Sequence, residues 1–188
     1  MTRTTLIRAL FVTCIAAYPF LIYFGLQHLP PTFFAVLLMI LVAMRYGVLL
    51  PEERPVVIPM LLIYICYALV AAISGSEMML LYYPAVVNFT LCGVFLNSLR
   101  QGDPLLLRFV RARGVPINEY VPLYMFNLTL IWAVFFIANG AISIWSGFVS
   151  MEVWTLYNGF LSYCLVALLI GAEYVFRIWY KKSKGVRS

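Results

Sequence analysis

The sequence predicts an all-α membrane protein with about six transmembrane helices, on the strength of three observations. The 188-residue chain is 64% hydrophobic and only 11% charged, whereas soluble domains carry roughly a quarter charged residues. Apolar segments recur at about the length of a spanning helix, roughly 20 residues. The basic residues all fall on one side of the resulting topology. The strict apolar–polar alternation of a membrane β-barrel is absent from the sequence, so helices are favoured.

The apolar segments predict a single integral membrane domain covering residues 1–188. We expect spans at about residues 6–26, 32–50, 56–73, 78–99, 121–148 and 157–176. The first span begins with basic residues, as a signal peptide does. Its apolar run continues to Leu26 without a small-residue cleavage site, so we interpret it as an uncleaved helix. Arg45 interrupts the second span near its end, where its charged group can reach the lipid headgroups.

The thirteen Lys and Arg residues orient these six spans. With the N-terminus inside, all thirteen lie in cytoplasmic segments or at cytoplasmic helix ends, and the outer loops contain none. This bias predicts that both termini are cytoplasmic. The net charge of +6 then indicates attraction to an anionic inner leaflet and not to nucleic acid. We expect Trp145 and the outer-loop residue Trp154 in the outer aromatic belt, and Trp179 in the inner one.

The longest cytoplasmic loop contains an amphipathic segment at residues 103–114. Its apolar residues recur at helical spacing opposite three basic ones, Arg108, Arg111 and Arg113. Asp103 is a candidate N-cap and Gly114 a candidate stop. We expect a short helix on the membrane surface, which serves either as a spacer or as a docking site for a partner or an anionic headgroup.

Two pairs of apolar segments resemble each other across the two halves of the chain. YPFLIYFGL is similar to YPAVVNFTL, and LVAAISG is similar to LVALLIG. Pro19 and Pro84 each fall within a span, where proline frees a backbone carbonyl that neighbouring groups must satisfy. These pairs fit an inverted 3+3 repeat of the kind found in many transporters, and they equally fit chance similarity between apolar segments.

The polar residues within the spans are candidates for helix packing or for ligand binding. They are Asn88, Asn97, Asn127, Asn139, Asn158 and Glu173. Asparagine bridges membrane helices through hydrogen bonds worth about 1 kcal/mol or less. Glu173 precedes Arg177 by one turn, which fits a structural ion pair and also a ligand, proton or headgroup site. The sequence shows no phosphate loop, metal-ligand set or activated nucleophile, so we expect no catalytic residue, metal or cofactor.

Several segments resemble an uncharacterised bacterial inner-membrane protein family. They are NLTLIWAVFFIANG, WTLYNGFLSY and GAEYVFR in the second half, with YPFLIYFGL and YPAVVN earlier in the chain, so the resemblance covers nearly the whole sequence. Genes of that family are typically found in clusters for aryl polyene pigments and related fatty-acid-like lipids. More distantly, WAVFF and PLLLRF are similar to the intracellular septation protein A family. The resemblance implies a cell-envelope location and lipid handling, and it assigns no catalytic residue.

The polar residues that match the family form the candidate lipid-binding or substrate-binding set. They are Tyr18, Tyr83, Asn88, Asn139, Tyr157, Asn158 and Glu173. Tyr157 and Asn158 are expected near the outer face and Glu173 near the inner face, which suits a path or a lipid groove better than a compact active site.

The leading hypothesis is a non-enzymatic protein of the bacterial inner membrane. It would bind, help to move or scaffold the synthesis of a lipid-like envelope component, with an aryl polyene among the candidates. Its partners would be membrane lipids and envelope or lipid-biosynthesis proteins, with no nucleic acid. The alternatives are a small lipid transporter or flippase, and a lipid-modifying membrane enzyme.

Overall fold

The chain is mostly helical in the part that the computed structural model describes, namely residues 20–25, 28, 29, 33, 34, 37, 54–114 and 117–183. The helices in order are α3 (Arg54–Ser74), α4 (Glu77–Arg100), α5 (Leu105–Ala112), α6 (Val121–Val149), α7 (Met151–Leu156), the π-helical turn η2 (Tyr157–Leu161) and α8 (Ser162–Ser183). No β-strand occurs among these residues. The all-α prediction is therefore confirmed for this part of the chain.

Three of these helical segments are long and apolar enough to cross a bilayer. Two of them are α4 and α6, and the third, Met151–Tyr180, runs without interruption through α7, η2 and α8. The apolar part of α3, Ile58–Ser74, is shorter. The chain is thus a membrane protein by the length and composition of its helices. The last four predicted spans overlap α3, α4, α6 and the segment Met151–Tyr180, of which the last three are long enough to cross a bilayer. The first two predicted spans lie largely outside the described residues.

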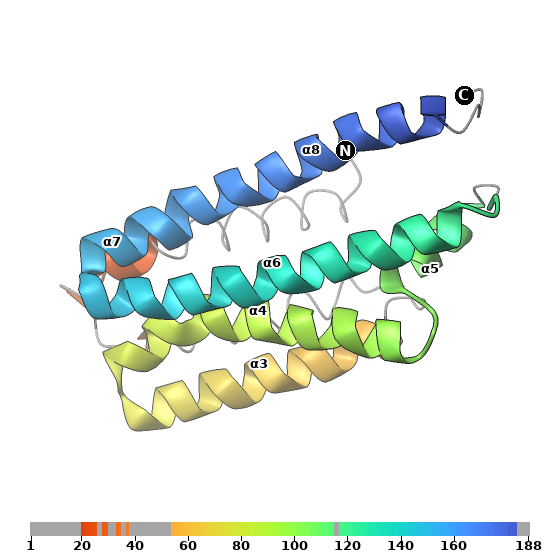
Figure 1. Ribbon diagram of the computed structural model, residues 1–188. Coiled ribbons are helices and arrows are strands. Elements are labelled where there is room, and N and C mark those ends of the chain that lie inside the picture. Colours follow the sequence, from red (N-terminus) through yellow and green to blue (C-terminus); the bar gives the residue numbers. More distant parts are fainter. Residues whose placement is uncertain are drawn as a thin grey trace, which may run out of the picture.

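The helices α4 and α6 form the central pair of the structure. α3 lies along α4, and α7 lies against α6, with α8 continuing beyond it (Figure 1). The α4–α6 contact is close because α6 presents small residues there, as is common between membrane helices. Ala133 is fully buried, and a Cβ atom at Gly140 would lie 3.1 Å from the Phe89 ring and 3.2 Å from the Cβ of Asn88.

The connection between α6 and α7 is a single residue, Ser150. Its backbone is extended, and its side chain accepts a hydrogen bond from the Val153 N–H at 3.2 Å, which caps the new helix. The sequence SMEVW, predicted as an outer loop, is therefore mostly the first turn of the last long helix. That helix begins at Met151 instead of at the predicted residue 157, because one serine cap suffices to reverse the chain.

Trp154 was predicted in the outer aromatic belt, and that prediction is wrong. Its side chain is fully buried, and its indole N–H donates a 2.8 Å hydrogen bond to the carbonyl of Leu81 on α4. This carbonyl lies in the turn before Pro84, where proline disturbs the regular helical hydrogen bonds. The buried indole thus satisfies its own donor while tying α7 to α4. Trp145 and Trp179 are exposed, at 60% and 61%.

α5 is the short helix predicted within residues 103–114, but it is capped differently. Asp103 does not cap it. Its carboxylate instead binds Arg108 at 3.0 Å and Arg111 at 2.6 Å. The hydroxyl of Ser98 on α4 accepts the hydrogen bond from the N–H of Leu105 at 3.0 Å. Gly114 ends this segment in the left-handed region, with φ +66°, as predicted.

The close α4–α6 approach predicts that Gly140→Val is destabilising. Overpacking of this kind costs about 1–3 kcal/mol, because the new methyl groups would press on the Asn88 Cβ, which the α4 backbone holds in place. Gly93→Val is the matched control, since a Cβ at Gly93 on α4 meets nothing within 4 Å. Unfolding midpoints in detergent measure both. Equal midpoints for the two variants would contradict the close packing.

Candidate functional site

Three of the predicted site residues form one partly buried hydrogen-bonded chain, the Asn139 network. The Asn88 amide donates to the carbonyl of Pro84 at 2.8 Å, and the Asn139 amide donates to the Asn88 side-chain oxygen at 3.0 Å. The Tyr157 hydroxyl completes the chain by donating to the Asn139 side-chain oxygen at 2.6 Å. Helices α4 and α6 and the turn η2 are thereby linked through side chains that belong to the resemblance-based candidate set.

Asn158 belongs to a second buried group, the Asn158 network, with Ser143 and Ser146 of α6. The Ser143 hydroxyl donates to the Asn158 side-chain oxygen at 2.7 Å. The Asn158 amide donates to the Trp154 carbonyl at 3.0 Å and reaches the Ser146 hydroxyl at 3.4 Å. Sequence reasoning missed both serines. Both serines lie on the same helix face as Asn139, and this spacing could have indicated a polar cluster. Serine side chains, however, change the hydropathy of a span very little.

Both networks lie where the last long helix widens into a π-helical turn. Tyr157 and Asn158 open η2, and both are buried, at 7% and 5% exposure. π-helical turns are rare and frequently mark functional sites. Here the side chains at the turn bond to α6, so their polar atoms serve helix association, which is the ordinary role of buried asparagine in a membrane bundle.

Tyr83 lies apart from these networks, in an aromatic cluster between α3 and α4. Its ring is buried and lies 6.1 Å from the ring of Tyr64 and 6.4 Å from that of Tyr67, centroid to centroid. The Tyr67 hydroxyl donates to the carbonyl of Met79. Tyr18, the remaining candidate from the first span, lies outside the described residues.

Glu173 forms a separate site near the other end of the last long helix. At 1.5 Å per residue, it lies roughly 24 Å along the helix from Tyr157. The Tyr124 hydroxyl of α6 donates to the Glu173 carboxylate at 2.8 Å, and Arg177 approaches the same oxygen at 3.5 Å. The Glu173–Arg177 pair that the sequence suggested is therefore present. Tyr124 was missed, since it is 49 residues away in sequence and no local pattern connects the two.

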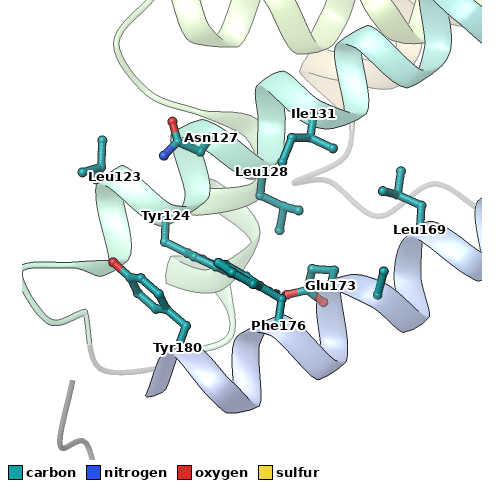
Figure 2. A pocket seen from close by; sticks show the side chains of 10 residues that line it. Leu123, Tyr124, Asn127, Leu128, Ile131, Leu169, Glu173, Phe176 and Tyr180 are labelled. Carbon is teal, nitrogen blue, oxygen red and sulfur yellow. Dashed lines mark hydrogen bonds between the residues drawn. The ribbon is translucent and has the colours of Figure 1, made fainter. Parts of the chain in front are cut away.

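An apolar cleft of about 420 Å³ surrounds Glu173 between α6 and α8 (Figure 2). Its lining residues are Leu123, Tyr124, Asn127, Leu128, Ile131, Leu169, Ala172, Glu173, Phe176 and Tyr180. The volume falls within the range of about 300–1,000 Å³ that is usual for small-molecule sites. Aromatic rings close one part of it, because Tyr124 stacks on Phe176 at 6.3 Å and on Tyr180 at 5.3 Å.

The predicted basic patch is divided in the structure. Arg108 and Arg111 are both bonded to Asp103. Arg113 instead lines a second cavity, which α5, α6 and α8 enclose and to which Glu173 and Arg177 also contribute. Within the described residues, no group of three or more His, Cys, Asp or Glu side chains is placed to hold a metal ion.

Comparisons with known proteins do not identify a family for this chain. No protein-family model, no curated protein and no solved structure matches the chain. The candidate site is therefore defined by its own geometry: an apolar cleft with one carboxylate, held by a tyrosine and an arginine.

The Tyr124–Glu173 hydrogen bond predicts that Tyr124→Phe destabilises the α6–α8 contact. The loss of this hydrogen bond should cost about 1 kcal/mol. Hydrogen bonds to charged acceptors are stronger than those between neutral groups, but interhelical hydrogen bonds in membrane proteins contribute less on average. Thermal unfolding in detergent measures the loss. Tyr120→Phe is the control, because the Tyr120 hydroxyl makes only a 3.5 Å contact with Asn118. A Tyr124→Phe protein as stable as this control would show that the bond contributes nothing.

Proposed function

We propose that the chain is a non-enzymatic protein of the bacterial inner membrane that binds a lipid-like envelope component in the α6–α8 cleft. In this role it helps to move that component or scaffolds its synthesis. The observation that carries the proposal is the cleft itself, which combines apolar walls with the Glu173 carboxylate. The ion-pair partner of Glu173, Arg177, lies just outside the cleft lining. A site of this composition suits an amphiphile, with its chain along the walls and its polar end near the pair.

The position of the cleft supports a ligand drawn from the bilayer. Leu123, Ile131 and Phe176 line the cleft and are also 64%, 49% and 48% exposed, so the cleft opens on the outside of the helix pair. Both walls belong to helices that are long and apolar enough to cross a bilayer, and in the proposed arrangement the outer surface of these helices faces acyl chains. A lipid can therefore enter sideways without crossing an aqueous phase.

The length of the cleft supports an acyl-type chain. Its α8 wall extends from Leu169 to Tyr180, roughly 16 Å at 1.5 Å per residue. This is about half of the roughly 30 Å hydrocarbon thickness of a bilayer, which is the depth of one leaflet.

Binding in one leaflet fits the distribution of polar groups better than a path across the membrane does. Tyr157 and Asn158, the candidates near the other end of the helix, are engaged with Asn139 and Ser143. Glu173 is the candidate that reaches a cavity. The resemblance to the inner-membrane family of aryl polyene clusters supports an envelope lipid as the ligand, with an aryl polyene or related acyl compound among the candidates.

Filling the cleft should weaken this binding. Leu169→Trp places a bulky ring in the α8 wall, and we expect the affinity for a fluorescent-tailed phospholipid in detergent to fall about tenfold, or 1.4 kcal/mol. Leu165→Trp, one turn earlier on α8 and 39% exposed, makes the same change outside the cleft and should bind normally. Unchanged binding by Leu169→Trp, in a protein that unfolds at the normal temperature, would exclude the cleft as the lipid site.

A further inference from the structure

A second cavity lies on the opposite side of the α6–α8 contact from the cleft. Its volume is about 270 Å³, and its lining residues are Leu106, Phe109, Val110, Arg113, Met125, Leu128, Trp132, Ile170, Glu173 and Arg177. Leu128 and Glu173 line both spaces. The cleft and the second cavity are therefore neighbours, with these two side chains between them.

The charges around the second cavity are unequal. Arg113 and Arg177 bring two positive charges and Glu173 brings one negative charge. Arg177 shares the Glu173 carboxylate with the Tyr124 hydroxyl. The Arg113 side chain is exposed, and its guanidinium makes no hydrogen bond or ion pair with any residue in the described part of the chain. One formal positive charge is left over, which complements a monoanion.

We infer that Arg113 and Arg177 bind the phosphodiester headgroup of an anionic phospholipid whose chain lies in the α6–α8 cleft. The inference rests on the proposed function and narrows its ligand class. A guanidinium presents paired donors that match the oxygens of a phosphate, and a phosphodiester carries the single negative charge that the cavity leaves unbalanced. The other basic residues of α5 do not compete, because Asp103 holds Arg108 and Arg111.

The walls of the second cavity favour a lipid headgroup over a free anion. Apart from Arg113, Glu173 and Arg177, the residues that line the second cavity are apolar or aromatic, and they include Phe109 and Trp132. A free phosphate would lose part of its hydration at the two arginines and would bury no apolar surface in return. A phospholipid offsets the same loss by burying its chain, because the adjoining cleft is apolar and opens to the bilayer.

The experiment uses the full-length protein and measures equilibrium binding of fluorescent-tailed lipids in detergent. Three probes share one tail: a phosphatidylglycerol, a phosphatidylcholine and an uncharged diacylglycerol. Arg113→Gln should weaken phosphatidylglycerol binding about tenfold, since a charge-assisted hydrogen bond is lost, while diacylglycerol binding stays the same. Arg100→Gln is the matched control, because Arg100 is an exposed arginine at the end of α4. This variant should bind phosphatidylglycerol and diacylglycerol as the wild type does.

The outcomes separate this inference from the proposed function. Equal phosphatidylglycerol affinity in the wild type and in Arg113→Gln would overturn the headgroup site, as would a stronger affinity for phosphatidylcholine than for phosphatidylglycerol. Complete displacement of the lipid by excess inorganic phosphate would show that the free anion is the ligand. If diacylglycerol still binds the wild type in these cases and binds Leu169→Trp about tenfold more weakly, the cleft remains a lipid site. If no probe binds at all, the proposed function itself fails.

Discussion

The architecture depends on buried hydrogen bonds between helices that have no hydrophobic reason to associate. Lipid tails are as apolar as the side chains they touch, so packing and polar contacts must hold membrane helices together. The Asn139 network supplies such contacts between α4, α6 and η2. Gly140, the residue after Asn139 on α6, lets α4 approach α6 closely. Any one of these amides left unpaired in hydrocarbon would cost several kcal/mol, so the network specifies the arrangement as well as stabilising it.

The hydrogen bonds at the beginning of the last long helix account for the position of the cleft. The last long helix is held at its beginning, where Trp154, Tyr157 and Asn158 all bond to α4 or α6. Beyond η2 the residues of this helix become largely exposed. The hydrogen bond from the Tyr124 hydroxyl to the Glu173 carboxylate is the main polar contact between this part of the helix and α6. A helix fixed firmly at one end and lightly at the other leaves room beside it. That room is the apolar cleft, with the Glu173 carboxylate at its wall (Figure 2).

Hydropathy predicted the long helices of the described chain well, because length and apolar composition decide them locally. The α4 and α6 spans were placed within two residues of their ends, and the Glu173–Arg177 pair follows from helical spacing. The reversal at Ser150 was missed, since one capping serine replaced the expected loop, and Trp154 was consequently assigned to the interface instead of the core. Tyr124, Ser143 and Ser146 were missed as well. Their partners are distant or small, and a single sequence carries no signal for contacts that only the packed helices create.

A double-mutant cycle on Asn139 and Tyr157 tests most directly whether their hydrogen bond holds the bundle together. The free energy of unfolding in detergent would be measured for Asn139→Leu, Tyr157→Phe, the double variant and the wild type. Interhelical hydrogen bonds in membranes average about 0.6 kcal/mol and reach about 1.7 kcal/mol, and this buried, charge-free bond should fall in the upper half of that range. Strictly additive losses, with no coupling between the two positions, would contradict the account.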